Sequence, residues 1–128
     1  NYFDKQINKF QIKDLLIVHG PQDKNKIKEI LSNTKILLLP SYEEGWSIII
    51  YEALFYGCEI IAYDLPALSQ INSYIHLVNN NKEMLKMVDL ISNSNARLKP
   101  RPDKKFFNNY SWKNVAFDEE TIFKRILG

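Results

Sequence analysis

The chain has 128 residues, 45% hydrophobic and 25% charged, which is typical of one globular domain with a modest core. Its formal net charge of +2 is too small to predict nucleic acid as a partner on electrostatic grounds. The single cysteine, Cys58, excludes an intramolecular disulfide framework and favours the cytoplasm, and no apolar run approaches the roughly 18 residues of a membrane-spanning helix.

The chain opens on an amphipathic stretch with no strand before it, which is typical of a segment taken from inside a larger protein. In residues 2–10 the apolar side chains recur at helical spacing, and we predict a helix there. Residues 15–20, LLIVHG, form a continuous and partly β-branched run that ends at Gly20 and Pro21. This pattern predicts a buried strand.

The central part of the chain alternates between the two kinds of element. Residues 23–33 return to helical spacing and predict a second helix. Residues 35–40, KILLLP, are an apolar run stopped by proline, which predicts a second buried strand. Residues 47–56 predict a third helix, because Gly57 follows them as a C-terminal cap.

Two strands and a helix follow this part. Residues 59–64, EIIAYD, and residues 74–78, YIHLV, are predicted strands, and residues 82–93 are a predicted helix. The side chains of that helix expected to face the core are Leu85, Val88 and Ile91. The alternation of buried strands with helices of about ten residues predicts an α/β domain with a parallel sheet.

The last part of the chain is predicted to leave this pattern. Residues 93–104 read as an exposed basic linker, because Pro100 and Pro102 prevent regular pairing. Residues 111–127 then predict a closing helix with Ser111 as its N-cap.

The segment between the second predicted strand and its helix has the features of a ligand site. In an open parallel sheet, ligands bind outside the carboxyl ends of strands, at helix N-termini. Residues 40–47 occupy that position, and Gly45 allows close approach of the backbone to a ligand. The amides of residues 46–48 are expected to point outward unpaired, which favours an anion such as a phosphate.

Two glutamates, Glu44 and Glu52, lie on either side of this predicted phosphate position. If both were helical, a rise of about 1.5 Å per residue would separate them by roughly 12 Å. That is about the distance from one end of a sugar diphosphate to the ribose at the other, and carboxylates are strong acceptors for sugar hydroxyls. The ligand class with hydroxyls at both ends and a diphosphate between them is the nucleotide sugar.

The segment PSYEEGWSIIIYEALFYGCEIIAYD resembles the nucleotide-binding signature of the retaining glycosyltransferases of family 4 (group 1 glycosyltransferases), which have the GT-B fold. That signature has a proline-serine after a strand, then Glu-Gly-aromatic-Gly, and then a second glutamate before a small residue and a strand. The matching residues are Pro40, Ser41, Glu44, Gly45, Trp46, Glu52, Ala53 and Gly57. The resemblance extends more loosely over residues 12–78, and YSWKNVAFDEETIF resembles the closing helix of the family.

The resemblance implies the C-terminal, donor-binding domain of such an enzyme, with a Rossmann-like, doubly wound sheet that is incomplete at its N-terminus. The implied activity is hexosyltransferase-like. A sugar would be transferred from a nucleotide diphosphate donor with retention of anomeric configuration. The acceptor, a glycan, a lipid or a small molecule, would be held by an N-terminal domain outside this chain, so we expect the chain alone to be inactive. No spacing of His, Cys or Asp predicts a metal site, and no cofactor is expected.

The resemblance also implies roles for individual residues. Glu44 would be the catalytic residue and bind the transferred sugar, while Glu52 would bind the ribose hydroxyls, and Gly20 would begin the base-binding loop. Backbone contacts to the sugar and the diphosphate would come from Gly45, Trp46, Ser47 and Ile48. Ser47 stands where the family has a second glycine, and the family's phosphate-clamping arginine and lysine come from a part of the domain that is not in this chain.

Other readings stay open at this point. The chain could be a non-catalytic module that binds a nucleotide or a sugar for regulation, or an interaction domain whose site has decayed. Packing is the alternative role for Trp46. A turn or capping role is expected for His19, and a buried structural position is expected for His76 and Cys58. The basic run at Lys99, Arg101, Lys104 and Lys105 is expected to be solvated, with peripheral contact to an acidic membrane surface as the alternative.

The implied strand order also predicts how the isolated chain behaves. Residues 15–20 would be the third strand and residues 35–40 the fourth, which two earlier strands separate in a doubly wound sheet. Without those strands, two unpaired edges would line a gap. We therefore expect the chain to associate with another copy, to re-pair its strands, or to be marginally stable.

Overall fold

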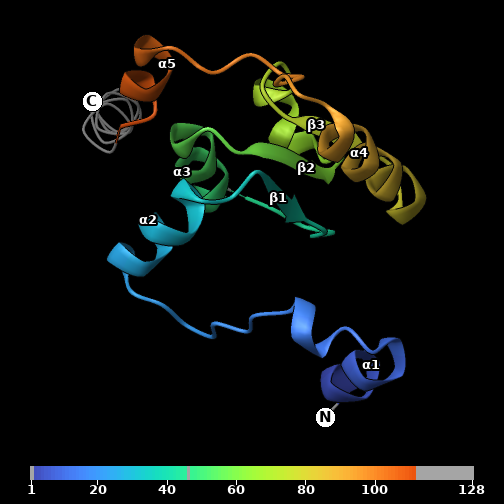
Figure 1. Cartoon of the computed structure of the whole chain (residues 1–128). Coiled ribbons are helices and arrows are strands. Elements are labelled where there is room, and N and C mark those ends of the chain that lie inside the picture. The colour runs from blue at the N-terminus through green and yellow to red at the C-terminus, as the bar shows by residue number, and fades with distance from the viewer. Residues whose placement is uncertain (1, 46, 112–128) are drawn as a thin grey trace, which may run out of the picture.

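The computed structural model describes residues 2–45 and 47–111 (Figure 1). The predicted closing helix at residues 111–127 therefore lies outside the described residues except for its first position, and Trp46 lies outside them too. No helix in the described ranges is long and apolar enough to cross a membrane.

Three short parallel strands form the sheet, in the order β1, β2, β3 (Figure 1). Their bounds are Ile36–Leu39 for β1, Glu59–Tyr63 for β2 and His76–Val78 for β3. Leu37 lies opposite Ile60 in the first pair, and Ala62 lies opposite Leu77 in the second. The α/β class with a parallel sheet is thus confirmed, with strands shorter than predicted.

Most of the α-helices lie where the sequence predicts them. The α-helices are α1 Tyr2–Phe10, α2 Lys24–Ser32, α3 Ile48–Tyr56, α4 Asn81–Asn93 and α5 Lys104–Asn109, and the 3₁₀ helices are η1 Lys13–Leu15 and η2 Pro66–Ile71. The first four α-helices confirm the predictions, whereas α5 and both 3₁₀ helices were not predicted. Gly57 ends α3 in a left-handed conformation, with φ of 84°, as the sequence predicts.

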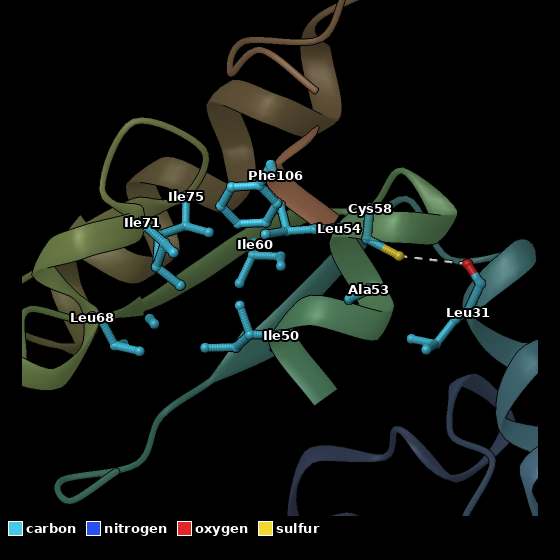
Figure 2. Close-up of a cluster of buried hydrophobic side chains, with 11 residues drawn as sticks. Leu31, Ile50, Ala53, Leu54, Cys58, Ile60, Leu68, Ile71, Ile75 and Phe106 are labelled. Carbon is cyan, nitrogen blue, oxygen red and sulfur yellow. Dashed lines mark hydrogen bonds between the residues drawn. The ribbon is translucent and has the colours of Figure 1, made fainter. Parts of the chain in front are cut away.

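The core lies on both faces of β2, all five residues of which are buried. Ile60 and Ala62 point to the cluster formed with α2, α3 and α5, which Figure 2 shows around Ile50, Leu54 and Phe106. Ile61 and Tyr63 belong to a second cluster, formed with α4. Helices therefore cover both faces of the sheet, as in a Rossmann-like, doubly wound fragment.

Cys58 packs in the first of these clusters as a buried apolar residue, as predicted. It is fully buried, and its thiol donates to the Leu31 carbonyl over 3.4 Å (Figure 2). Burial raises the pKa of this thiol, with small opposing effects from Arg97 and Arg101. The thiol therefore stays protonated at neutral pH, and Cys58 links α2 to the end of α3.

The prediction of a buried strand at residues 15–20 is wrong. Lys13–Leu15 form a 3₁₀ turn, and the chain then runs to Gly20 without pairing to a strand. Leu15, Ile17 and Val18 are exposed, Ile17 to 81%. A parallel strand needs a neighbour for its hydrogen bonds and a layer for each face. The described residues provide neither at this segment, so its apolar character does not produce a strand.

The strand predicted at residues 35–40 forms, but as an edge and not as a buried strand. β1 pairs with β2 on one side, and no strand among the described residues pairs with its other side. Leu38 is 44% exposed. The open edge agrees with the expectation of an unpaired edge, and association through it stays a prediction.

The inward face predicted for α4 is partly wrong. Ile91 is buried and Val88 is half-buried, but Leu85 is 68% exposed and Met84 is buried instead. Met84 packs with Ile61 and Val78 of the sheet. The sheet contacts only one side of α4, and that side carries Met84 and Ile91 but not Leu85.

Residues 94–103 form no helix or strand, yet they are attached to the sheet by hydrogen bonds. The Leu98 N–H donates to Glu59 Oε1 over 2.6 Å, and Glu59 Oε2 lies 2.9 Å from His76 Nε2. Glu59 and His76 are 4% and 7% exposed. His76 thus has the structural role that the sequence predicts for it, and Glu59 joins the starts of two strands to the segment after α4.

The surroundings of Glu59 determine its protonation. Burial by itself raises the pKa of the carboxyl, but hydrogen bonds from His76 and from the Leu98 N–H outweigh it. Arg97 adds a positive charge nearby, and the result is a pKa below the ordinary value of 4.5. The carboxylate is therefore charged at neutral pH, in the form that accepts both hydrogen bonds.

A pH titration of stability should detect this shift. A carboxyl whose pKa is lower in the folded than in the unfolded chain stabilises the fold above the unfolded value, and this stabilisation disappears as pH falls through the folded value. The free energy of unfolding should therefore decrease as pH falls below 4.5. The loss should be smaller in Glu59→Gln, as measured by denaturant unfolding at several pH values. Parallel curves for both proteins would contradict the shift.

Candidate functional site

The candidate site lies at the edge of the sheet where the three parallel strands end, which we call the carboxyl edge. The strands end at Leu39, Tyr63 and Val78. Their parallel pairing places these ends side by side, and the loops that follow leave the sheet from the same edge. Residues 40–47 form the loop between β1 and α3, so the predicted ligand-binding segment lies at the carboxyl edge.

The N-terminus of α3 differs from the other capped helices of the chain. Asp23, Asn80 and Asp103 each accept a hydrogen bond from a first-turn N–H of α2, α4 and α5. Ser47 occupies this position in α3, but its side chain makes no capping hydrogen bond. The carbonyl of Ser47 accepts from the Ile50 N–H over 3.0 Å. By helix geometry the amides of Ile48 and Ile49 have no intrahelical partner, and the positive end of the helix dipole favours an anion.

Gly45 lies just before this helix end and has space around it. Beyond its two neighbours in the chain, a Cβ built on Gly45 meets no atom within 4 Å, and the residue is exposed. Packing within the protein therefore does not require glycine at this position. Close approach of a ligand to the backbone stays the predicted reason for it.

The two glutamates flank the helix end, although not at helical spacing. Glu44 is half-buried in the loop, and Glu52 is half-buried on α3. The helix begins only at Ile48, so the roughly 12 Å expected if both residues were helical does not apply. The neighbouring Glu43 is exposed. The structure thus places both predicted carboxylates on one loop-and-helix unit at the carboxyl edge.

An aromatic pair connects the loop to the sheet, and sequence reasoning missed it. The ring of Tyr42 stacks on that of Tyr63 with centroids 5.2 Å apart. The Tyr63 hydroxyl donates to Asn81 Oδ1 in the first turn of α4. Burial, followed by the effect of Tyr42, raises the pKa of Tyr63, which stays a neutral donor. The only sequence signal for this contact was the tyrosine just after Ser41. Its partner, Tyr63, lies at the end of β2, about 20 residues further along the chain.

Gly20, the remaining predicted binding residue, lies on a different segment. It is exposed, between η1 and α2, and has a φ of 62°, which favours glycine. The preceding carbonyl, of His19, accepts a hydrogen bond from the side chain of Gln22. His19 and Gly20 therefore form part of a turn. The substrate-binding role of Gly20 stays a prediction.

Among the described residues, no group of three or more His, Cys, Asp or Glu side chains is arranged to hold a metal ion. The groups that the candidate site offers are backbone amides, two carboxylates and the Tyr42 ring. Such a set can bind an anion at the helix end and neutral hydroxyls on either side of it.

Comparison with known families identifies the family of this chain. The family model described as "Glycosyl transferases group 1" matches residues 1–97, which include the loop after β1, all of α3 and the three strands. The chain belongs to the group 1 glycosyl transferases. As a group 1 glycosyl transferase domain, it has a sugar donor and an acceptor as its general partners. No curated protein and no solved structure matches the chain.

Proposed function

We propose that this group 1 glycosyl transferase chain is the donor-binding domain of a family 4 enzyme with the GT-B fold. It would bind a nucleotide diphosphate sugar and transfer the sugar, a hexose, with retention. The observation that carries this proposal is the start of α3 at the carboxyl edge, where Ser47 provides no side-chain cap and two carboxylates flank the free amides. An anion with hydroxyl-bearing groups on both sides fits this arrangement.

Each part of the donor then has a partner in the chain. The diphosphate lies at the amides of residues 46–48, next to Gly45, where the absence of a side chain allows close approach of the backbone. Glu52 accepts hydrogen bonds from the ribose hydroxyls, and Glu44 accepts them from the transferred sugar. Gly20 contributes to the pocket of the base.

The same geometry assists bond breaking. When the bond between the sugar and the diphosphate breaks, negative charge increases on the leaving phosphate oxygens. The partial positive charge at the N-terminus of α3 stabilises this developing charge. Glu44, as the catalytic residue, holds the sugar in position and stabilises the positive charge that develops on it. The acceptor and the groups that bind it lie outside this chain, so the chain by itself does not catalyse sugar transfer. We place the enzyme in the cytoplasm or at the surface of a membrane.

A screen of nucleotide sugars by ligand-observed NMR on the parent protein tests this function. One nucleotide diphosphate sugar should give saturation-transfer signals from its base, ribose and sugar protons. Incubation with that donor and an acceptor should give a product whose anomeric proton signal has the configuration of the donor. A product of the opposite configuration would contradict retention. Failure of every nucleotide sugar to bind would contradict the donor site itself.

A further inference from the structure

A cavity of about 440 Å³ lies at the opposite end of the sheet from the candidate donor site. Its wall includes Lys35, Glu59, Arg97 and Arg101. Lys35 directly precedes β1 and Glu59 begins β2, so the cavity lies where the strands start. Four steps of about 3.3 Å along β2 separate this end from the carboxyl edge by roughly 13 Å. The cavity is therefore separate from the donor site.

The position of Lys35 is determined by the end of α4. Its ammonium donates to the carbonyls of Ser92 and Ser94, at 3.2 Å each. An ammonium has three N–H donors, so one remains for a ligand in the cavity. The backbone carbonyls hold the charge at the cavity wall.

Arg97 contributes a second positive charge, held from the other side. Its Nη1 donates to the Gly57 carbonyl and its Nε to the Lys99 carbonyl, both over 2.6 Å. Its Nη2 is withdrawn from solvent and has no hydrogen-bond partner among the described residues. A guanidinium nitrogen in this state is costly, and an anion in the adjoining cavity would offset that cost through its charge.

Arg101 provides the third positive charge, and its guanidinium lies against the Gly57 backbone. A Cβ on Gly57 would overlap the Arg101 guanidinium, which therefore lies directly against the glycine. Gly57 has a φ of 84°, a backbone conformation that favours glycine. Arg101 is exposed, and its guanidinium is accessible from the cavity.

The negative groups around the cavity do not balance these three charges. The Glu59 carboxylate is already bonded to His76 and to the Leu98 N–H. The C-terminal ends of α3 and α4 each contribute about half a negative charge through the helix dipole. Together these groups supply about two negative charges, which leaves a surplus of roughly one positive charge at the cavity.

We propose that the cavity between Lys35, Arg97 and Arg101 is a binding site for a small phosphate-bearing molecule. Cationic side chains with free N–H donors are the groups that bind phosphate oxygens in proteins. The cavity volume lies within the range of about 300–1,000 Å³ found for small-molecule sites, so it has room for an organic group beside the phosphate. The site goes beyond the proposed transfer reaction, because it lies away from the donor and needs no residue of the carboxyl edge.

Phosphate titration of the ¹⁵N-labelled full chain tests this site. At constant ionic strength, maintained with sodium chloride, inorganic phosphate should give saturable shifts of the Ala96, Arg97 and Leu98 amides. Arg101→Gln should weaken binding by about tenfold or more, because it removes a charge-assisted hydrogen bond. Lys35→Gln is a second variant on the opposite wall and should weaken binding as well.

Lys82→Gln provides the matched control, because it removes one positive charge at the exposed start of α4, outside the cavity. It should bind phosphate like the wild type. Glycerol 3-phosphate forms a second arm of the titration. Tighter binding of this ester than of inorganic phosphate supports the site with an organic phosphate as its ligand, and equal binding supports it with the free ion. Non-saturable shifts with both compounds, or equal weakening in Lys82→Gln, would overturn the proposal.

Discussion

Glu52→Gln in the parent enzyme is expected to weaken the binding of a nucleotide diphosphate and of the matching nucleotide sugar alike. Glu52 is half-buried in the second turn of α3, and we propose that it binds the ribose there. A hydrogen bond to a charged partner contributes about 1.5 to 3 kcal/mol, so each loss should be about ten- to a hundredfold. Isothermal titration calorimetry with both ligands measures it.

Glu44→Gln should separate the two ligands. Glu44 lies in the loop before α3, where the proposed sugar lies, so the variant should bind the free diphosphate normally and lose affinity for the sugar-bearing donor only. Glu43→Gln is the matched control, because Glu43 is an exposed carboxylate in the same loop. It should bind both ligands like the wild type. Equal losses for Glu44→Gln and Glu52→Gln on the free diphosphate would contradict this division of roles, and wild-type binding by both would contradict the site.

Ile60→Ala should lower the free energy of unfolding of the chain by about 2–5 kcal/mol, since truncation of a fully buried isoleucine leaves a cavity. Ile17→Ala should change the same quantity by no more than about 0.5 kcal/mol, because Ile17 is 81% exposed. Both residues belong to short apolar runs that predict buried strands. Urea unfolding of the two variants and the wild type measures the contrast.

The pair of variants also tests whether residues 15–20 acquire a partner in solution. If this segment pairs with the open edge of β1 in another copy, Ile17 becomes buried, and Ile17→Ala then costs about as much as a core truncation. The measurement should therefore be made at two protein concentrations. A large cost of Ile17→Ala that grows with protein concentration would show that the segment is buried between copies in solution, and would support self-association.

Local signals in the sequence were sufficient for most of the α-helices and for the position of the candidate loop. The apolar spacing in α1, α2 and α4 and the glycine after α3 act within a few residues, so they need no information about the rest of the fold. The same holds for the signature around Glu44 and Glu52. Its residues form one continuous loop and helix, which the structure places at the end of a parallel strand.

The aromatic contact of the candidate site and the polar contacts at the opposite end of the sheet depended on the tertiary structure. The ring of Tyr42 stacks on that of Tyr63. The Glu59 carboxylate bonds to His76 and to the Leu98 N–H, which lie 17 and 39 residues further along the chain. No local pattern relates such residues, because their contact depends on the pairing of β2 with its neighbours. The cationic cavity has the same origin, since its charged side chains come from three separate segments.

The sequence by itself determined the first four α-helices, that the sheet is parallel, and which loop carries the carboxylates, because periodicity, caps and turn residues act over short distances. Only the tertiary structure decided which apolar runs are buried. LLIVHG and EIIAYD are alike as sequences, but only the second lies between a strand on each side and a helical layer on each face. A strand is stable only with such neighbours, because its hydrogen bonds and its burial both come from other parts of the chain.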